Sequence, residues 1–285
     1  MSDIIISRAS KDDIELIRSF INFNWKKNHI LYRDKKFFHF QHVRNNEVNF
    51  IISKSKKKLV GILGFISFSN YKPCDVFVAL WKVLPNTNRP MLGIEMLNFL
   101  QNLKGINNIL SLGINDRNKS ICKILNFYVN RLNHYVLFNL KIKNFNIAKI
   151  NNEVNLDFVS LTCKNNFVVK QINKENLIKF PFEKYSKNIP KKDYNFFLKR
   201  YFEHPSYKYK FYGVFDEKKI ISFYVIRKQE MKKSNVLRII DFIGEEKGIY
   251  SFTTFLKIFL RKEKFEYVDF LSYGLNKKYL INAGF

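Results

Sequence analysis

The sequence predicts an α/β protein of the mixed, α+β kind, built from two domains that share one order of strands and helices. Three observations predict this class. Of the 285 residues, 46% are apolar and 16% aromatic, which is enough to fill a substantial core. The stretch from Cys74 to Gln101 has the pattern of a buried strand followed at once by a helix. The order of predicted elements in the first half begins again at Phe167, which indicates an internal repeat.

The stretch from Cys74 to Gln101 is the best-defined part of the pattern. Val76–Leu84 is apolar and rich in β-formers, and Pro85 ends the strand because it cannot donate to a sheet ladder. Asn86–Asn88 is a polar turn that can cap a helix, and Pro90 suits a first helical turn. A helix that starts directly after a strand presents free backbone N–H groups, which bind anions such as phosphate.

The other elements of the first half follow from apolar periodicity and turn residues. Helical spacing after the cap Ser10 predicts a helix, and the segment Asn24–His42 is aromatic and basic with broken helical spacing. The remaining predictions are the strands Ile4–Arg8, Val48–Ser53, Leu59–Ser69, Asn108–Ile114 and Tyr135–Ile142, the last one closing the sheet, and the helix Lys119–Tyr128.

The second half repeats this order. Between the halves, the Asn-rich stretch 146–166 predicts a linker. The domains are therefore expected at 1–145 and 167–285. The second copy has no closing strand of its own, which would leave an open sheet edge for a partner or a second copy of the chain to cover. The elements predicted are the strands Phe167–Ile172, Tyr209–Phe215, Ile220–Arg227, Val236–Ile243 and Tyr267–Leu271 and the helices Lys192–Phe202, Ile249–Leu260 and Lys277–Asn282.

Composition excludes several classes of protein. No apolar run is long enough to span a bilayer, and the N-terminus lacks the pattern of a signal peptide. Cys74, Cys122 and Cys163 are far apart and in no metal-ligand spacing, which fits a reducing cytoplasm and predicts no metal site.

The formal net charge of +26 has two interpretations. One is an anionic partner, such as nucleic acid, anionic lipid or a phosphorylated small molecule. The other is compositional bias, because Lys, Asn, Ile, Phe and Tyr are over-used together, as in AT-rich genomes. The scattered lysines favour bias and argue against a nucleic-acid partner, although the charge would still attract anionic substrates.

The order of elements and several short segments carry a family resemblance. The segments are Asn28-His29-Ile30-Leu31, Val60-Gly61-Ile62-Leu63-Gly64-Phe65, Ala79-Leu80-Trp81-Lys82-Val83, Lys199-Arg200-Tyr201 with His204-Pro205, Leu237-Arg238-Ile239-Ile240-Asp241-Phe242-Ile243-Gly244 and Ala283-Gly284-Phe285. With them the chain resembles a tandem protein of the GNAT family of acyl-CoA-dependent N-acyltransferases. Within that family it is similar to proteins of bacterial surface-polysaccharide gene clusters.

The resemblance implies a coenzyme site in the first half for acetyl-CoA or another acyl-CoA. The family's pyrophosphate loop has the pattern Gln/Arg-x-x-Gly-x-Gly/Ala, and here Asn88 takes the Gln/Arg place, Met91 the first glycine and Gly93 the second. The second half has Glu245 and Glu246 in this loop and is not expected to bind the cofactor. The cofactor-binding residues implied are Val83, Leu84, Asn88, Arg89, Leu92, Gly93, Ile94 and Asn118.

Two residues are candidates for proton transfer. His29 lies in the segment that overhangs the acceptor site in this family, and an unperturbed histidine can take the proton of an attacking amine. Tyr128 lies one turn beyond Leu125, which occupies the position of the family's catalytic Tyr. The alternative for His29 is a histidine that lies on the surface or packs on a helix.

Four residues are candidates for binding the acceptor: Arg33, Trp81, Arg200 and Asp241. Arg33 is also explained as an exposed charge and Trp81 as a core residue. A buried Asp241 needs hydrogen-bond donors, as a structural anchor or as a ligand of the substrate amine. Arg238 is three residues before Asp241 on one strand, so the two are expected on opposite faces.

These observations lead to the expectation of a cytoplasmic N-acyltransferase. It would transfer an acyl group, most simply acetyl, from acyl-CoA to a small-molecule amine, such as an amino sugar or a nucleotide-activated sugar for surface glycans. One alternative is aminoacyl transfer from tRNA to a cell-wall precursor. Another is a non-catalytic binding module with a decayed cofactor loop, which Met91, Leu125 and the pair Glu245–Glu246 favour.

Overall fold

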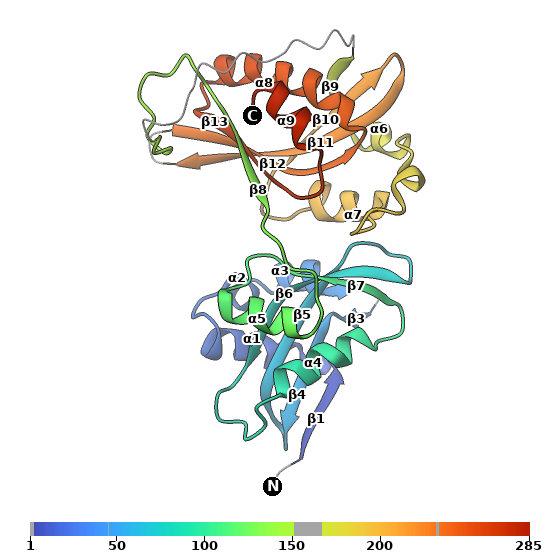
Figure 1. Ribbon diagram of the computed structural model, residues 1–285. Helices are drawn as coiled ribbons and strands as arrows, with labels where there is room; N and C mark the ends of the chain where they lie inside the picture. The colour runs from blue at the N-terminus through green and yellow to red at the C-terminus, as the bar shows by residue number, and fades with distance from the viewer. Residues whose placement is uncertain (1–2, 45, 151–166, 232–233) are drawn as a thin grey trace. The chain divides into compact units, whose positions relative to one another are not determined.

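The chain folds into two units, each built on its own sheet (Figure 1). The computed structural model describes residues 3–44, 46–150, 167–231 and 234–285. By their contacts, Met1–Leu125 and Phe182–Lys199 form the first unit, and Asn126–Pro181 and Arg200–Phe285 form the second. The first unit therefore ends earlier than the boundary expected at residue 145, and it includes a segment that the sequence assigned to the second half.

The first unit contains a five-stranded sheet in the order β1-β4-β5-β6-β7. Neighbouring strands are antiparallel except for β6 and β7, which are parallel. The short strands β2 and β3 pair separately. The strands are β1 (Ile4–Arg8), β2 (Val43–Arg44), β3 (Glu47–Val48), β4 (Phe50–Ser55), β5 (Lys58–Ser67), β6 (Cys74–Val83) and β7 (Ile106–Leu110).

Helices pack on the sheet of the first unit through apolar faces. In α1, the buried residues Ile14, Ile17 and Ile21 share one side at helical spacing, and they join a core with Phe38 and Phe50. The helix α4 likewise buries one apolar side, with Leu92, Met96 and Leu100. The helical elements are η1 (Lys11–Asp13), α1 (Ile14–Asn24), α2 (Ile30–Arg33), α3 (Lys35–His42), α4 (Leu92–Gln101), α5 (Asp116–Ile124), η2 (Phe182–Tyr185) and α7 (Tyr194–Phe197).

The segment Phe182–Lys199 is anchored to the first unit by two buried carboxylates. Asp193 caps α7 by accepting from the N–H of Phe196 at 2.7 Å, and it accepts from the Ser69 hydroxyl at 2.5 Å. Asp75, at the start of β6, accepts from the N–H of Lys191 at 2.7 Å. Such charge-assisted hydrogen bonds are among the stronger ones, so they fix this late segment on the early sheet.

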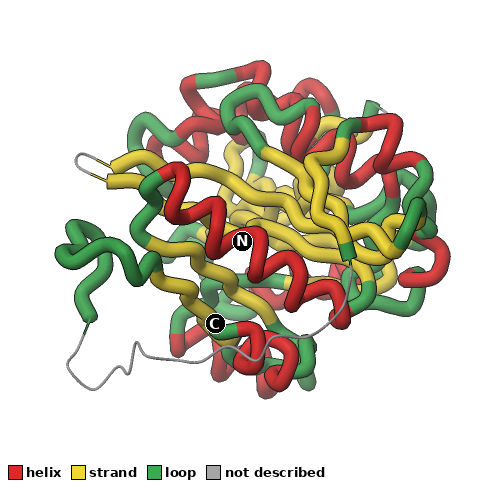
Figure 2. Tube along the Cα trace, turned by 90° about the horizontal axis from the view of Figure 1, so that it is seen from above, coloured by secondary structure: helices red, strands yellow, loops and turns green. Residues whose placement is uncertain are grey.

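The second unit contains a six-stranded sheet in the order β8-β13-β12-β11-β10-β9. Seen from above, helices lie across its strands (Figure 2). Its core joins the buried residues Tyr224, Ile239, Phe252 and Leu256. Its elements are β8 (Asn133–Phe138), β9 (Val168–Ile172), α6 (Lys174–Ile178), the π-helical turn η3 (Leu198–Phe202, of which Arg200–Phe202 belong here), β10 (Lys210–Asp216), β11 (Lys219–Met231), β12 (Ser234–Gly244), η4 (Glu246–Gly248), α8 (Ile249–Glu263), β13 (Tyr267–Ser272) and α9 (Lys277–Ala283).

The structure corrects the expectation for the closing strand. The stretch Tyr135–Ile142 was predicted to close the first sheet, but β8 pairs antiparallel with β13 in the second sheet. The edge beside β13, expected to be open for a partner or second copy, is thus covered by this chain itself. Alternation of apolar residues predicts a strand but does not say which sheet it joins. Of the predicted linker 146–166, residues 151–166 lie outside the described residues.

The fold class is as predicted: each unit is a mixed sheet flanked by helices. The two units also share a strand arrangement, an antiparallel meander followed by one parallel pair. That pair is β6 and β7 in the first unit and β12 and β13 in the second.

Candidate functional site

The parallel strands of the first unit, β6 and β7, separate partway along β6. Gly64 of β5 pairs with Leu80 and Phe65 pairs with Val78, so Ala79 is an extra, bulged residue of β6. The last paired residues of β6 and β7 are Phe77 and Leu110. Beyond this pair β6 continues to Val83, and Ala79 is exposed in the middle of the strand. The bulge and the strand separation therefore coincide.

Two backbone N–H groups of β6 point toward the edge of the strand that is no longer paired with β7. The N–H of Leu84 donates to the carbonyl of Val60 on β5 at 2.8 Å, so it is not free to bind a substrate oxygen. Because N–H groups alternate sides along a strand, those of Trp81 and Val83 point away from β5. Of the implied cofactor-binding residues Val83 and Leu84, Val83 has an N–H directed away from β5 and Leu84 does not; the N–H of Trp81 is directed like that of Val83.

The start of α4 lies against β6. Gly93 packs on the indole of Trp81, since a Cβ at residue 93 would lie 3.4 Å from its Nε1. The N–H of Leu92 donates to the carbonyl of Arg89 at 3.0 Å, whereas Gly93 and Ile94, as second and third residues of the helix, have N–H groups that point out of its end. Met91, in the first-glycine position, is 55% exposed, so its side chain does not fill the core.

Charges at this helix start are already paired. The Arg89 guanidinium donates to the carbonyl of Ile4 at 3.0 Å and forms an ion pair of 2.5 Å with Glu95. Asn88 is exposed and has a positive φ of 50°.

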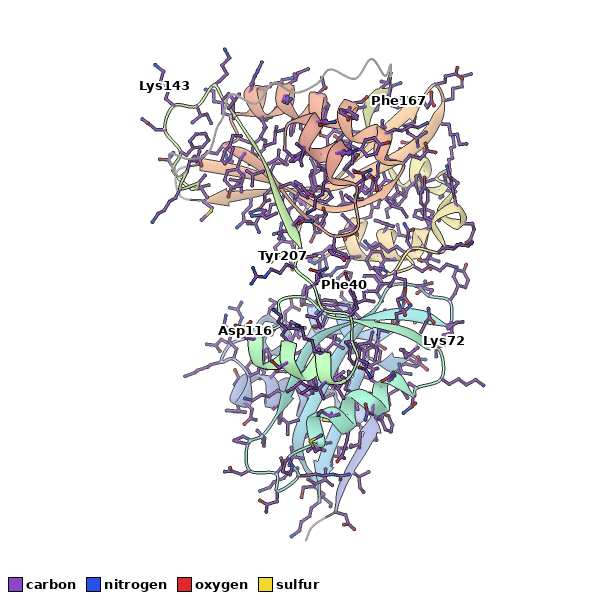
Figure 3. The ribbon with its side chains drawn as sticks, viewed as in Figure 1. Phe40, Lys72, Asp116, Lys143, Phe167 and Tyr207 are labelled. Carbon is purple, nitrogen blue, oxygen red and sulfur yellow. The ribbon has the colours of Figure 1, made fainter. Side chains whose placement is uncertain are left out.

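Asn118 lies in the first turn of α5, and its N–H donates to the cap Asn115 at 2.9 Å. The cap of α5 is therefore Asn115, and Asn118, one of the implied cofactor-binding residues, lies three residues later. Asp116, which begins α5, is labelled in Figure 3.

His29 caps the short helix α2. Its Nδ1 accepts from the N–H of Leu31 at 3.3 Å. Burial, together with the nearby charge of Lys26, lowers the pKa of His29, so the neutral ring needed for this acceptor is favoured. Arg33, at the end of α2, is exposed. The carbonyls of Leu31 and Tyr32 accept from Arg18, which fixes this helix on α1.

Tyr128 belongs to the second unit by its contacts. It is 76% exposed, and its hydroxyl pairs with that of Tyr273 and accepts from Asn130 Nδ2 at 2.9 Å. The structure thus places the two residues predicted to transfer protons in different units, Tyr128 in the second and His29 in the first.

The second unit repeats the bulge. Val225 pairs with Asp241 and Ile226 with Ile239, so Ile240 is the extra residue of β12, as Ala79 is of β6. Ile239 and Phe270 are the last paired residues of the parallel strands. In both units, the bulged residue therefore lies just beyond the last paired residues of the parallel strands.

The residue after the bulge differs between the units. Leu80 in the first unit belongs to the apolar core, whereas the corresponding residue of the second unit is Asp241. Asp241 is 7% exposed and accepts from the Tyr201 hydroxyl at 2.7 Å. The prediction that this carboxylate needs donors is confirmed. Burial and the Asp241 carboxylate raise the pKa of Tyr201 well above its usual value, so the tyrosine stays protonated.

The bulge also corrects one prediction about faces. Arg238 pairs with Arg227 and Asp241 pairs with Val225, two residues of β11 that share a face. Arg238 and Asp241 therefore lie on the same face of the sheet, not on opposite faces, because the extra residue Ile240 shifts the alternation. Arg238 forms its ion pair with Asp269 at 3.4 Å.

Basic and aromatic residues also lie together in the second unit. Arg227 lies over the ring of Tyr207 at 4.5 Å, and the rings of His204 and Tyr207 are 4.9 Å apart. Burial, with the positive charges of Arg200 and Arg227, lowers the pKa of His204 to about 4. Sequence reasoning singled out Arg200 and His204 but missed Arg227 and Tyr207, because their strand and loop positions carry no local pattern.

Two kinds of feature are absent from the described residues. No helix among them is both long and apolar enough to cross a bilayer. In the same parts of the chain, no three His, Cys, Asp or Glu side chains lie together in a way that could hold a metal ion.

Comparisons with known proteins support the fold. No family model matches the chain, and no curated protein matches its sequence. A GCN5-related N-acetyltransferase from Anabaena variabilis ATCC 29413 matches with a TM-score of 0.61 and 10% identity over 96% of this chain and 67% of that one. A probable N-acyltransferase from Enterococcus faecalis V583 matches with a TM-score of 0.60 and 8% identity over the same shares.

A third similar structure is the N-myristoyltransferase of Saccharomyces cerevisiae with bound myristoyl-CoA. Its TM-score is 0.52 at 13% identity, over 100% of this chain and 76% of that chain. The chain thus spans about two thirds of the first two proteins and three quarters of the third. The fold is GNAT-like, that of the GCN5-related N-acetyltransferases. Identities this low establish the fold alone.

Proposed function

We propose that this protein is an N-acyltransferase that uses acyl-CoA, bound by its first unit. The observation that carries the proposal is the separation of β6 from β7 at the Ala79 bulge, beside the start of α4. The edge of β6 that faces this gap carries backbone donors for a thioester oxygen, and the helix start offers backbone donors for phosphate. The similar folds named above belong to proteins described as acetyl- or acyltransferases, which supports the same class of chemistry.

In the proposed reaction, the neutral amine attacks the thioester carbon, the C–S bond breaks and the thiolate leaves. The N–H groups of Trp81 and Val83 point toward the gap and would polarise the thioester oxygen. The N–H groups of Gly93 and Ile94 would bind the pyrophosphate of the coenzyme. His29, kept neutral by its lowered pKa, is the candidate base for the amine proton. A role for Tyr128 as the acid remains a prediction.

For the acceptor we propose a small amine, an amino sugar or nucleotide-activated sugar of surface glycan synthesis. This class rests on the resemblance of the short segments named above to proteins of polysaccharide gene clusters. Trp81, half-buried beside Gly93, has a ring that can stack on a sugar.

Calorimetric titration with acetyl-CoA tests the coenzyme site. We expect micromolar binding that is lost in Ala79→Phe, because a phenyl ring on the exposed bulge fills the gap. Ile5→Phe is the matched control, since Ile5 is 67% exposed on β1 and the variant adds the same ring away from the gap. Equal loss of binding in both variants, or undiminished binding in Ala79→Phe, contradicts the proposed site.

A second candidate function is a binding module that carries out no transfer. The ion pair of Arg89 with Glu95 favours it, because Glu95 places a negative charge in the first turn of α4, where a pyrophosphate would bind. A thiol-release assay with amino-sugar acceptors separates the two functions. Coenzyme binding without release of free thiol supports the binding module. If the protein does not bind the coenzyme but binds tRNA in a salt-sensitive way, aminoacyl transfer is supported instead.

A further inference from the structure

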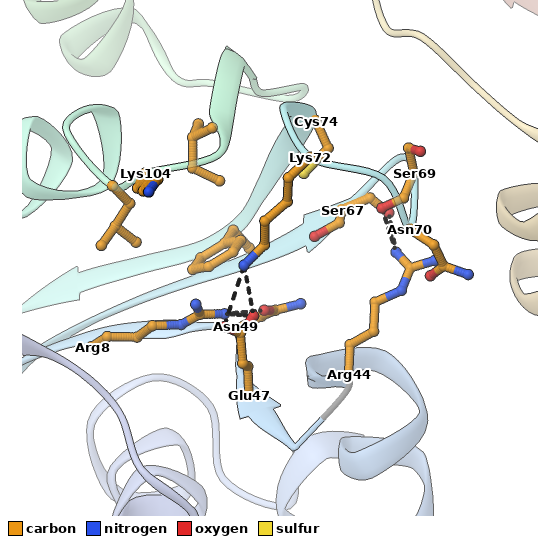
Figure 4. Close-up of a pocket in the computed structure, with 13 residues that line it drawn as sticks. Arg8, Arg44, Glu47, Asn49, Ser67, Ser69, Asn70, Lys72, Cys74 and Lys104 are labelled. Atoms are coloured by element: carbon orange, nitrogen blue, oxygen red, sulfur yellow. Dashed lines mark hydrogen bonds and ion pairs between the residues drawn. The ribbon is translucent and has the colours of Figure 1, made fainter.

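A pocket of the first unit lies where β6 begins, beyond the end of α4 (Figure 4). Five charged side chains line it: Arg8, Arg44, Glu47, Lys72 and Lys104. With four cations and one carboxylate, the charge of this lining is +3. A concave site with such an excess of one charge raises the local concentration of small ions of the opposite sign.

The two arginines are held in fixed positions. Arg8 donates to the Val48 carbonyl at 3.3 Å and to Asn49 Oδ1 at 3.0 Å. Arg44 donates from Nη1 to the carbonyls of Ser67 at 3.3 Å and Ser69 at 3.1 Å. Because the backbone already orders these guanidinium groups, a ligand loses little freedom of the protein when it binds them.

Arg44 retains an unused donor. Its Nε is buried and has no hydrogen-bond partner among the described residues. Burial removes solvent from the Arg44 guanidinium and thereby lowers its pKa. The carboxylate of Asp193 also acts on Arg44, but its oxygens accept from the Ser69 hydroxyl and the Phe196 N–H. A buried donor of this kind favours an additional anion.

The two lysines are more accessible. The Nζ atom of Lys72 lies 3.3 Å from Glu47, which also pairs with Arg8 at 3.1 Å. Lys104 is exposed, and within the described parts of the chain no hydrogen bond or ion pair engages its ammonium group. Glu47 is the one carboxylate of the lining, so it competes with any anion for Arg8 and Lys72.

We propose that this pocket binds the phosphate group of a small molecule, at a site separate from that of the coenzyme. Two guanidinium groups and two ammonium groups match a dianion with several acceptor oxygens better than a single carboxylate. The proposed coenzyme site begins at the Ala79 bulge, five residues along β6 from Cys74, which is roughly 17 Å in an extended strand. Glu47 pairs with Arg8 and Lys72, so it competes with the charge of the ligand for these two cations.

The test is calorimetric titration of the full chain with phenyl phosphate, at low salt. The double variant Lys72→Gln/Lys104→Gln is expected to weaken binding by about threefold to tenfold, as partly exposed charges contribute modestly. Glu47→Gln is expected to strengthen it, because it removes the competing carboxylate. General charge attraction predicts the same two directions, so a control with the same change of net charge is needed to show that the site is local.

The matched control is Lys57→Gln/Lys58→Gln, which changes the net charge equally. Lys58 begins β5 at the end opposite to Ser67, and both lysines are exposed. Equal weakening in this control overturns the proposal, as does binding of succinate as tight as that of phenyl phosphate. The Ala79→Phe variant should retain phosphate binding, so failure at the coenzyme site and failure here are distinguishable.

Discussion

At the scale of single residues, the buried pair of Tyr201 and Asp241 sets the second unit apart from the first. The first unit has a leucine at the position of Asp241, so the aspartate is not needed to make the bulged strand. A carboxylate in a core is retained only where donors satisfy it. This pair therefore ties the π-helical turn η3 to β12.

Replacement of Tyr201 tests this anchor. Tyr201→Phe removes one donor from a buried carboxylate and should lower the free energy of unfolding by about 1–3 kcal/mol. Tyr207→Phe is the control, because Tyr207 is 50% exposed. Urea unfolding measures both. If the two variants were equally stable, the hydrogen bond to Asp241 would not contribute to stability.

His204 makes stability depend on pH. Its folded-state pKa of about 4 lies below the usual 6.5, so between these values the unfolded chain binds more protons than the folded chain. Stability should therefore fall as the pH is lowered from 6.5 toward 4. Burial lowers the pKa of His29 as well, with the same sign.

The variant His204→Asn measures this contribution. An amide oxygen can accept the N–H groups of Ser206 and Tyr207, which now donate to Nδ1 of His204 at 3.1 and 3.0 Å. The variant should show a smaller loss of stability between pH 7 and pH 4.5 in urea unfolding. An unchanged pH dependence would assign the effect to other groups.

For single residues, the sequence predicts what hydrogen-bond partners a side chain needs better than it predicts which residues lie beside it. The need of Asp241 for donors follows from burying a charge, and the structure confirms it. The face shared by Arg238 and Asp241 was missed, because one inserted residue reverses the alternation and leaves no mark in a single strand. The roles of Gly93 and Met91 in binding stay predictions.

At the scale of elements, two glycines beside helix starts have different functions in the backbone. Gly244 ends β12 with a φ of +130°, and a Cβ there would lie 2.3 Å from the Cα of Ser222. Gly93 has room for a methyl group against Trp81. One position therefore requires glycine and the other does not.

Alanine at each position tests this difference. Gly244→Ala should destabilise the protein by roughly 2–5 kcal/mol, through backbone strain and overpacking against a strand. Gly93→Ala should leave stability unchanged or raise it by about 0.5–1 kcal/mol, since alanine is the better helix former. Thermal and urea unfolding compare them. A tolerated Gly244→Ala would show that β12 can end in another conformation.

For most elements, the sequence predicts existence and type but not exact ends. The predicted helix Lys119–Tyr128 is Asp116–Ile124 in the structure, and the predicted strand Asn108–Ile114 is Ile106–Leu110. Polar residues near each end offer several competing caps, and Asn115 precedes Asn118 as the one used.

At the scale of the whole molecule, β8 adds the last strand to the sheet of the second unit, not to that of the first. Leu137 of β8 is 4% exposed and belongs to the core of the second unit. Leu137→Ala should cost about 2–4 kcal/mol in that unit, through lost burial and a cavity. Hydrogen exchange should then rise in β13 and β12, while β4 and β5 of the first unit keep their protection.

Leu140→Ala is the control for this variant, because Leu140 is 57% exposed just after β8. Faster exchange in β4 and β5 in place of β13 would place the stabilising role of β8 in the first unit, as the sequence led us to expect.

The repeat is visible in the sequence, but the assignment of segments to units is not. The alternation of apolar residues along a strand shows that one face is buried, and this would be equally true in either sheet. The assignment of β8 depends on its pairing with β13. That of Phe182–Lys199 depends on the hydrogen bonds from Lys191 to Asp75 and from Ser69 to Asp193, which join residues distant in sequence.

The placement of Phe182–Lys199 has a consequence for folding during synthesis. The strands of the first sheet leave the ribosome well before this segment, which arrives only after β8 and β9. At bacterial or eukaryotic rates of elongation, the delay is on the order of ten seconds. Until then Asp75 and Ser69 lack the segment that binds them, so the nascent first unit is exposed to chaperones and proteases in an unfinished state.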